Sequence, residues 1–188
     1  MRPTYACSVT SKLHSVAAVA ASAVLLLSLA GCASTGAATP DETALATAAA
    51  SGACAGDSGV TVVVDDSALD DADAEQWCIA TDDTIAAADV LAQAGVETEG
   101  TDQYGDQVVC RVNGLPAADE AIEAEDGSDY FEACETMPAA FAYWSLWVQP
   151  AGSEWGYAQE GLSTLQLEPG DAIALLFTLH GEPAAPTS

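Results

Sequence analysis

The N-terminal 31 residues constrain this chain more than any other part of its sequence. Arg2 and Lys12 precede a nearly uninterrupted apolar run from Val16 to Ala30. The run is about 15 residues long, which is typical of a secretory signal peptide and short for a membrane-spanning helix of about 20 residues. The rest of the chain is therefore expected to fold after export.

The apolar run ends in the sequence Leu29-Ala30-Gly31-Cys32. Small residues before a cysteine let the backbone enter a peptidase cleft, and the thiol is a nucleophile that can be acylated. The pattern matches the lipobox of bacterial lipoproteins and predicts that residues 1–31 are removed and that Cys32 carries lipid. We expect a chain anchored by lipid at the extracytoplasmic face of the cell membrane. The competing interpretation is an ordinary secretory signal that contains a cysteine.

The charge balance after this cleavage is extreme. Arg111 is the one Lys or Arg that remains, and against 29 Asp and Glu it leaves a formal charge of −28. Nucleic acid is excluded as a partner, because its phosphates are bound by Lys and Arg. The simplest interpretation of the many Asp and Glu residues is a charged surface exposed to solvent. The alternative is a calcium site at Asp65-Asp66, Asp70-Asp71 and Asp73, which lack the glycine and terminal Glu of an EF-hand loop.

The predicted mature chain divides into a tether, one domain and a tail. Residues 32–57 are rich in Ala, Thr, Ser and Gly without periodicity, which is typical of a flexible spacer. Residues 181–188 carry Pro183 and Pro186 and are expected to be a disordered tail. The segment between them, 58–180, is long enough for a single hydrophobic core.

Four cysteines remain once Cys7 leaves with the signal and Cys32 is lipidated: Cys54, Cys78, Cys110 and Cys134. An even number in an exported chain favours disulfides, and three pairings are possible. We favour Cys54–Cys78 and Cys110–Cys134, because each closes a loop of about 25 residues around one structural unit. A zinc site is the weaker alternative, because the sequence has no C-x-x-C pair.

Hydrophobic patterning predicts an α+β domain in which one helix packs on a mostly antiparallel sheet of about five strands. The expected strands cover 59–64, 77–80, 107–113, 141–149 and 173–179. Oxygens at Thr81-Asp82-Asp83-Thr84 are expected to cap a helix that Gly95 ends. Its apolar positions are Ile85, Ala88, Leu91 and Ala92. Residues 97–106 are expected to be a polar loop, and 117–129 an acidic excursion.

The aromatic strand at 141–149 carries most of the functional information. Side chains alternate faces along a strand, so Trp144, Leu146 and Val148 share one face, which we interpret as core. The opposite face presents Tyr143, Ser145, Trp147 and Gln149, joined nearby by Trp155 and Tyr157. Tyr and Trp side chains that lie outside the core, each with a polar O–H or N–H group, are suited to bind a large, flat, partly apolar ligand. The alternative is that these rings fill a small second core beneath the excursion.

The order of several segments between about Val60 and Leu179 resembles the transcobalamin C-terminal-like domain family. The segments are Trp-Cys, Thr-Ile-Ala-Ala-Ala-Asp-Val-Leu-Ala-Gln-Ala-Gly-Val, Val-Val-Cys-Arg-Val-Asn-Gly, Ala-Tyr-Trp-Ser-Leu-Trp, Trp-Gly-Tyr-Ala-Gln-Glu-Gly and Glu-Pro-Gly-Asp-Ala-Ile-Ala-Leu-Leu-Phe. The resemblance implies a soluble-ligand-binding β-grasp fold for 58–180. It matches Tyr143, Trp144 and Trp147 to the family's aromatic strand, and Trp155, Tyr157 and Gly161 to the turn and strand that follow.

The resemblance also implies a function. It suggests a surface-anchored lipoprotein that captures cobalamin or a related corrinoid or tetrapyrrole as a ligand, with no intrinsic cofactor, for an energy-coupling-factor uptake system. The vertebrate carriers add a helical domain that this sequence lacks, so weak binding or a completing partner is expected. A protein-interaction domain without a small ligand is the alternative.

An enzyme is not expected. His180 is the one histidine after the signal and is interpreted as a bystander, and no Lys follows Lys12. Arg111 has two interpretations, a structural pair with nearby acids or a contact to an anionic group of a ligand.

Overall fold

The structure is a computed structural model that describes residues 49–69, 73–181 and 185–186. All of these belong to one compact unit, Thr43–Ser188. The predicted signal peptide, Cys32 and most of the predicted tether lie outside the described residues. No helix in the described part is long and apolar enough to cross a membrane.

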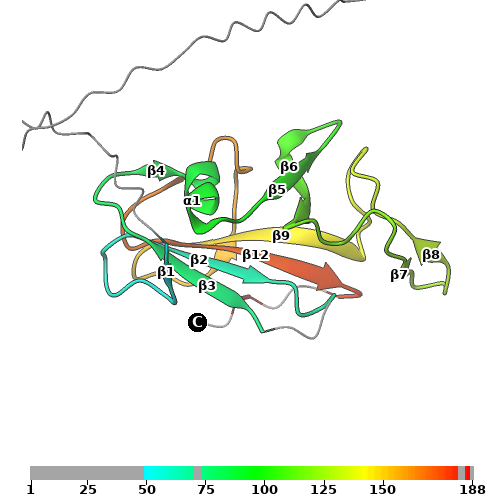
Figure 1. Ribbon diagram of the computed structural model, residues 1–188, viewed down its shortest axis with the longest axis horizontal. Coiled ribbons are helices and arrows are strands. Elements are labelled where there is room, and N and C mark those ends of the chain that lie inside the picture. The colour runs from blue at the N-terminus through cyan, green and yellow to red at the C-terminus, as the bar shows by residue number, and fades with distance from the viewer. Residues whose placement is uncertain (1–48, 70–72, 182–184, 187–188) are drawn as a thin grey trace, which may run out of the picture. The chain divides into compact units, whose positions relative to one another are not determined.

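A mixed six-stranded sheet forms the body of the domain, with strands in the order β1-β3-β2-β12-β9-β10 (Figure 1). Its strands are β1 (Ala50–Ser51), β2 (Val60–Asp65), β3 (Glu75–Ile79), β9 (Ala142–Gln149), β10 (Gly156–Tyr157) and β12 (Ala172–Leu179). The central pair, β2 and β12, is parallel, and the other neighbours are antiparallel. A parallel pair needs a crossover, and nearly all of the domain lies between these two strands.

The expectation of about five strands was wrong, and the α+β class with one helix on the sheet is confirmed. Two of the six strands, β1 and β10, were not expected; they are two residues long and lie at the sheet edges, whereas the strand expected at 107–113 pairs outside this sheet. A two-residue strand shows no hydrophobic alternation, so no periodic signal could reveal it. The strand predicted at 77–80 is β3, which begins two residues earlier and ends at Ile79.

Three further two-stranded ladders surround the sheet. They are β4 (Ile85–Ala86) with β11 (Gln166–Leu167), β5 (Thr98–Thr101) with β6 (Gly105–Val112), and β7 (Ile122–Glu123) with β8 (Asp129–Tyr130). The predicted polar loop 97–106 therefore contains a strand, and the acidic excursion contains most of a hairpin. Figure 1 shows β5 and β6 beside the helix, over the same face of the sheet.

The helix α1 (Ala87–Ala94) begins later than predicted and uses a different face. Its N-cap is Ala86, without a side-chain cap, because β4 pairs with β11 up to that residue. Thr81 instead closes its own turn with Asp83. The buried helical residues are Ala87, Val90 and Leu91, whereas Ala88 and Ala92 are exposed. The predicted stop is confirmed, since Gly95 adopts a left-handed conformation with φ of 76°.

Both faces of the sheet are apolar. The helix-face core includes Val62, Leu91, Trp144, Ile173 and Leu175. A smaller far-face cluster consists of Val63, Trp147, Ala174 and Leu176, with Trp155 packed against it.

Two disulfides join the segments, Cys54–Cys78 and Cys110–Cys134, as predicted. The first disulfide links the segment that precedes β2 to strand β3, and β1 pairs with the same strand. Residues 50–57, predicted to end the flexible tether, therefore contribute an edge strand and a disulfide to the folded part. The second disulfide is buried, with Cys110 2% and Cys134 4% exposed.

Candidate functional site

A groove runs between the edge of β6, the first half of β9 and the segment 157–162. Its first lobe has a volume of about 360 Å³ and an apolar floor that includes Val109, Trp144 and Leu162. A second lobe of about 440 Å³ continues past Met137 and Pro138. Val108, Val109, Tyr143 and Trp144 line both lobes. The groove is therefore one elongated apolar surface with aromatic walls.

Four of the six predicted ligand residues line this groove, namely Tyr143, Trp144, Tyr157 and Gly161. They come from β9, from β10 and from the segment that follows it. Trp147 and Trp155 do not line either lobe and belong to the far-face cluster instead. Trp147 is 7% exposed and lies in a small second core, but the residues of that core come from β2, β9, β12 and Trp155 and not from the acidic excursion. The strand alternation separated the two faces properly, but it could not say which face opens onto a groove.

Trp147 supports the groove from behind. Its ring stacks on Tyr157, with centroids 4.1 Å apart and an angle of 25° between the planes. Its indole N–H donates to Ser145 Oγ over 3.0 Å, and Ser145 Oγ donates to the carbonyl of Leu176 over 2.9 Å. Tyr157, 45% exposed, is thereby held at the mouth of the groove. A ring held from behind loses little freedom when a ligand covers its other side.

Trp144 is fixed as firmly at the groove floor. Its indole N–H donates to the carbonyl of Leu115 over 2.9 Å, and its ring packs edge-on against Phe177 at 5.4 Å. Trp155 differs, because its indole N–H is buried without a hydrogen-bond partner among the described residues. Such an unpaired buried donor costs about 1–3 kcal/mol.

Gly161 shapes the groove wall by its lack of a side chain. A Cβ at this position would lie 2.6 Å from Gln107 Cα and 2.8 Å from its carbonyl oxygen. The segment 158–162 can approach the backbone of β6 only because residue 161 is glycine. The role of Gly161 is therefore close packing on β6.

The sequence reasoning missed the half of the groove that comes from β6 and from the loop before β9. Gln107, Val108 and Val109 supply one wall, and Met137 and Pro138 close the second lobe. Met137 is 58% exposed, which is unusual for a large apolar side chain beside a groove. Its position in an acidic loop gave no periodic signal.

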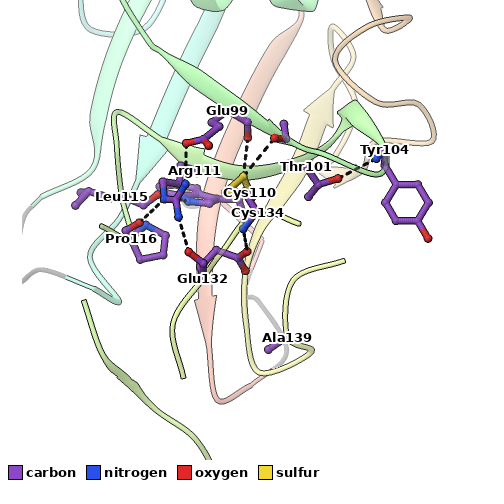
Figure 2. The surroundings of a disulfide bond; sticks show 12 residues. Glu99, Thr101, Tyr104, Cys110, Arg111, Leu115, Pro116, Glu132, Cys134 and Ala139 are labelled. Atoms are coloured by element: carbon purple, nitrogen blue, oxygen red, sulfur yellow. Dashed lines mark hydrogen bonds and ion pairs between the residues drawn. A yellow bond between two sulfur atoms is a disulfide. The ribbon is translucent and has the colours of Figure 1, made fainter. Parts of the chain in front are cut away.

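Arg111 is held entirely by the protein, as Figure 2 shows. It is 8% exposed; Nε donates to the carbonyl of Pro116 over 2.9 Å, and Nη1 donates to the Glu99 carboxylate over 2.8 Å. Nη2 donates to the carbonyl of Glu132. The guanidinium thus joins β5 and β6 to two loops beside the buried disulfide. Of the two interpretations of Arg111, the structural one accounts for its contacts.

A second polar cluster lies next to this arginine. Glu132 is 5% exposed and accepts hydrogen bonds from Tyr130 Oη at 2.5 Å and from the backbone N–H of Cys134 at 2.6 Å. Burial of the phenol and its hydrogen bond to Glu132 raise the pKa of Tyr130 to about 12. The cluster braces the loop that carries Cys134.

The residues considered for a metal site or for catalysis form no such site in the described part of the chain. Glu99, Cys110 and Cys134 lie within 4.8 Å of one another, but the two sulfurs are bonded to each other and offer no thiolate to a metal. Asp65 accepts hydrogen bonds from Ser67, and Asp70 and Asp71 lie outside the described residues. His180 stacks on Phe141 and lines neither lobe of the groove.

Comparison with known proteins identified no relative of this chain. No protein-family model matches the chain, and neither the curated proteins nor the solved structures contain a match.

Proposed function

We propose that this domain binds a flat, partly apolar ligand of the corrinoid or tetrapyrrole class in the groove between β6 and β9. The observation that carries the proposal is the convergence of Tyr143, Trp144 and Tyr157 on one apolar groove. Aromatic side chains contribute large contact areas with little loss of conformational entropy, which suits a broad ring. The resemblance to transcobalamin C-terminal-like domains supports cobalamin or a related corrinoid.

The size of the groove fits partial coverage of such a ligand. Its two lobes, of about 360 Å³ and about 440 Å³, each lie in the lower part of the range of about 300–1,000 Å³ for small-molecule pockets. The domain alone would cover one part of the ring and bind weakly. A transporter of the energy-coupling-factor type would complete the site, and the lipid on Cys32 would hold the domain beside it at the extracytoplasmic face of the cell membrane.

The proposed β-grasp topology is supported by the strand order. The first and last long strands of the sheet, β2 and β12, pair in parallel at its centre. The helix follows the first hairpin and packs on β2 and β3. We propose a binding rather than a catalytic role, because among the described residues a single carboxylate, that of Glu160, lines the two lobes.

The experiment that tests this function is a titration of the purified protein, with both disulfides intact, with cobalamin and cobinamide. Binding is followed by tryptophan fluorescence and checked by equilibrium dialysis. Tyr157→Ala should weaken binding by roughly 3- to 10-fold, the value of one aromatic contact of about 0.5–1.5 kcal/mol. Tyr104→Ala is the matched control, since Tyr104 is 40% and Tyr157 is 45% exposed. The absence of saturable binding, or an equal loss in both variants, would contradict the proposal.

A protein-interaction role is the second candidate, and one observation favours it. β9 pairs with β12 along its whole length but with β10 only at Trp147 and Val148. The edge at 142–145 has no strand partner among the described residues, and an extended peptide could add a strand there. A stable complex recovered from detergent-solubilised membranes, with no small ligand bound, would favour this role.

A further inference from the structure

We propose that the groove selects ligands whose ring substituents are amides or other groups without negative charge, and that it rejects ring carboxylates. This inference rests on the proposed function and names the ligand more narrowly. It derives from the charges around the groove and from the hydrogen-bonding groups that line it.

The lining of the groove contains no cationic side chain. In the first lobe the polar side chains are those of Gln107, Tyr143, Ser145, Tyr157, Gln159 and Glu160, and the second lobe adds none with a charge. A carboxylate on a bound ring would therefore meet Glu160 and no counter-charge. An unpaired carboxylate that loses its water in an apolar groove is strongly disfavoured.

No cation elsewhere in the domain is available to compensate. Arg111 is the one Lys or Arg beyond Lys12, and its guanidinium is fully engaged by Pro116, Glu99 and Glu132. It is 8% exposed and does not line either lobe. With 29 acidic residues in the chain, the long-range field at the groove is negative. This field opposes the approach of an anion as well as its binding.

The groove does offer partners for amides. Gln107 and Gln159 each carry a donor and an acceptor, which complement a primary amide. The carbonyl of Leu146 accepts a hydrogen bond from the Ala158 N–H, so the backbone groups of alternate β9 residues point to this edge. Those of Trp144 therefore face the groove, and no strand of the described part pairs with them there. An amide can use both a backbone N–H and a backbone C=O, whereas a carboxylate is repelled by the carbonyl.

The test compares cobinamide with cobyric acid, given the same axial ligands on cobalt. These corrinoids differ at one propionate side chain, which is a substituted amide in cobinamide and a free carboxylate in cobyric acid. Equilibrium dialysis against the intact protein gives both dissociation constants. We expect cobinamide to bind about tenfold more tightly at about 0.01 M salt, with the ratio shrinking towards 2 at about 1 M, where the Debye length falls from about 30 Å to about 3 Å.

Two variants locate the effect. Glu160→Gln should narrow the ratio at low salt, because it removes the carboxylate that lines the groove. Asp82→Asn removes the same charge from an exposed position in the turn before β4 and should leave the ratio unchanged. Equal affinities for the two corrinoids, or tighter binding of cobyric acid, would overturn the charge selection and leave the proposed function standing. Failure of both corrinoids to bind would overturn the proposed function and this inference together.

Discussion

Arg111 shows how much a single residue can organise in a chain with so few cations. The sequence indicated that this arginine stands almost alone among acids, but not which partner it meets. In the fold it donates to Pro116, Glu99 and Glu132, and two of these acceptors are backbone carbonyls. Carbonyl partners leave no signature in the sequence, because every residue has one.

Replacing Arg111 with Ala should lower the free energy of unfolding by about 2–5 kcal/mol, because buried carbonyls lose their donor. Arg111→Lys should recover only part of the loss, since an ammonium cannot reach three acceptors in the geometry of a guanidinium. Urea denaturation measures both values. Glu99→Gln is the control and should cost less than about 1 kcal/mol, because that carboxylate is 55% exposed. A drop in corrinoid affinity at unchanged stability would instead assign Arg111 to the ligand.

Tyr130 should make stability depend on alkaline pH. Its pKa is raised to about 12 in the fold, compared with about 10 in an unfolded chain. The folded state therefore favours the neutral phenol, and this contribution is fully present below about pH 10 and is lost as the pH rises towards 12. In Tyr130→Phe the decline of unfolding free energy with pH over this window should be shallower, as measured by urea titrations. Tyr104→Phe should keep the slope of the unmodified protein; an identical slope in Tyr130→Phe would refute the assignment.

At the scale of elements, strands with long hydrophobic patterns were predicted well. β2, β6, β9 and β12 lie within one or two residues of the expected strands, and the inward face of β9 is the predicted one. The start of α1 was missed because β11, about 80 positions further along the chain, pairs with β4 and delays the helix. A partner so distant in sequence leaves no local signal.

The segment after β10 offers a test of how one element forms the groove wall. Gly161→Ala would force a methyl group to within 2.6 Å of Gln107 Cα, so the segment must move away from β6. We expect a loss of about 1–3 kcal/mol in unfolding free energy and weaker ligand binding. Gly156→Ala is the matched control, because a Cβ there meets nothing within 4 Å. If the two variants unfold alike, the close approach to β6 is not required for stability.

At the scale of the whole molecule, charge repulsion should limit stability. The predicted mature chain carries a formal charge of −28, and compact acidic chains repel themselves. Raising sodium chloride from about 0.01 M to about 0.5 M should shift the urea midpoint upward, because the Debye length shrinks below the spacing of surface charges. Potassium chloride should give the same shift, as expected for screening. A midpoint that stays constant or falls would show that surface charge costs this fold little.

The sequence by itself determined the charge, the α+β class and the face of β9 that enters the core, and it favoured one of three possible disulfide pairings, which the structure then showed. These properties depend on composition or on short-range periodicity. The tertiary structure alone decided that Trp147 is buried while Tyr157 stays half-exposed, and that β6 and Met137 complete the groove. The physical reason is that a groove forms where segments far apart in sequence fail to fill the space between them. Local patterns describe what each segment buries, but the gap depends on how all of them pack.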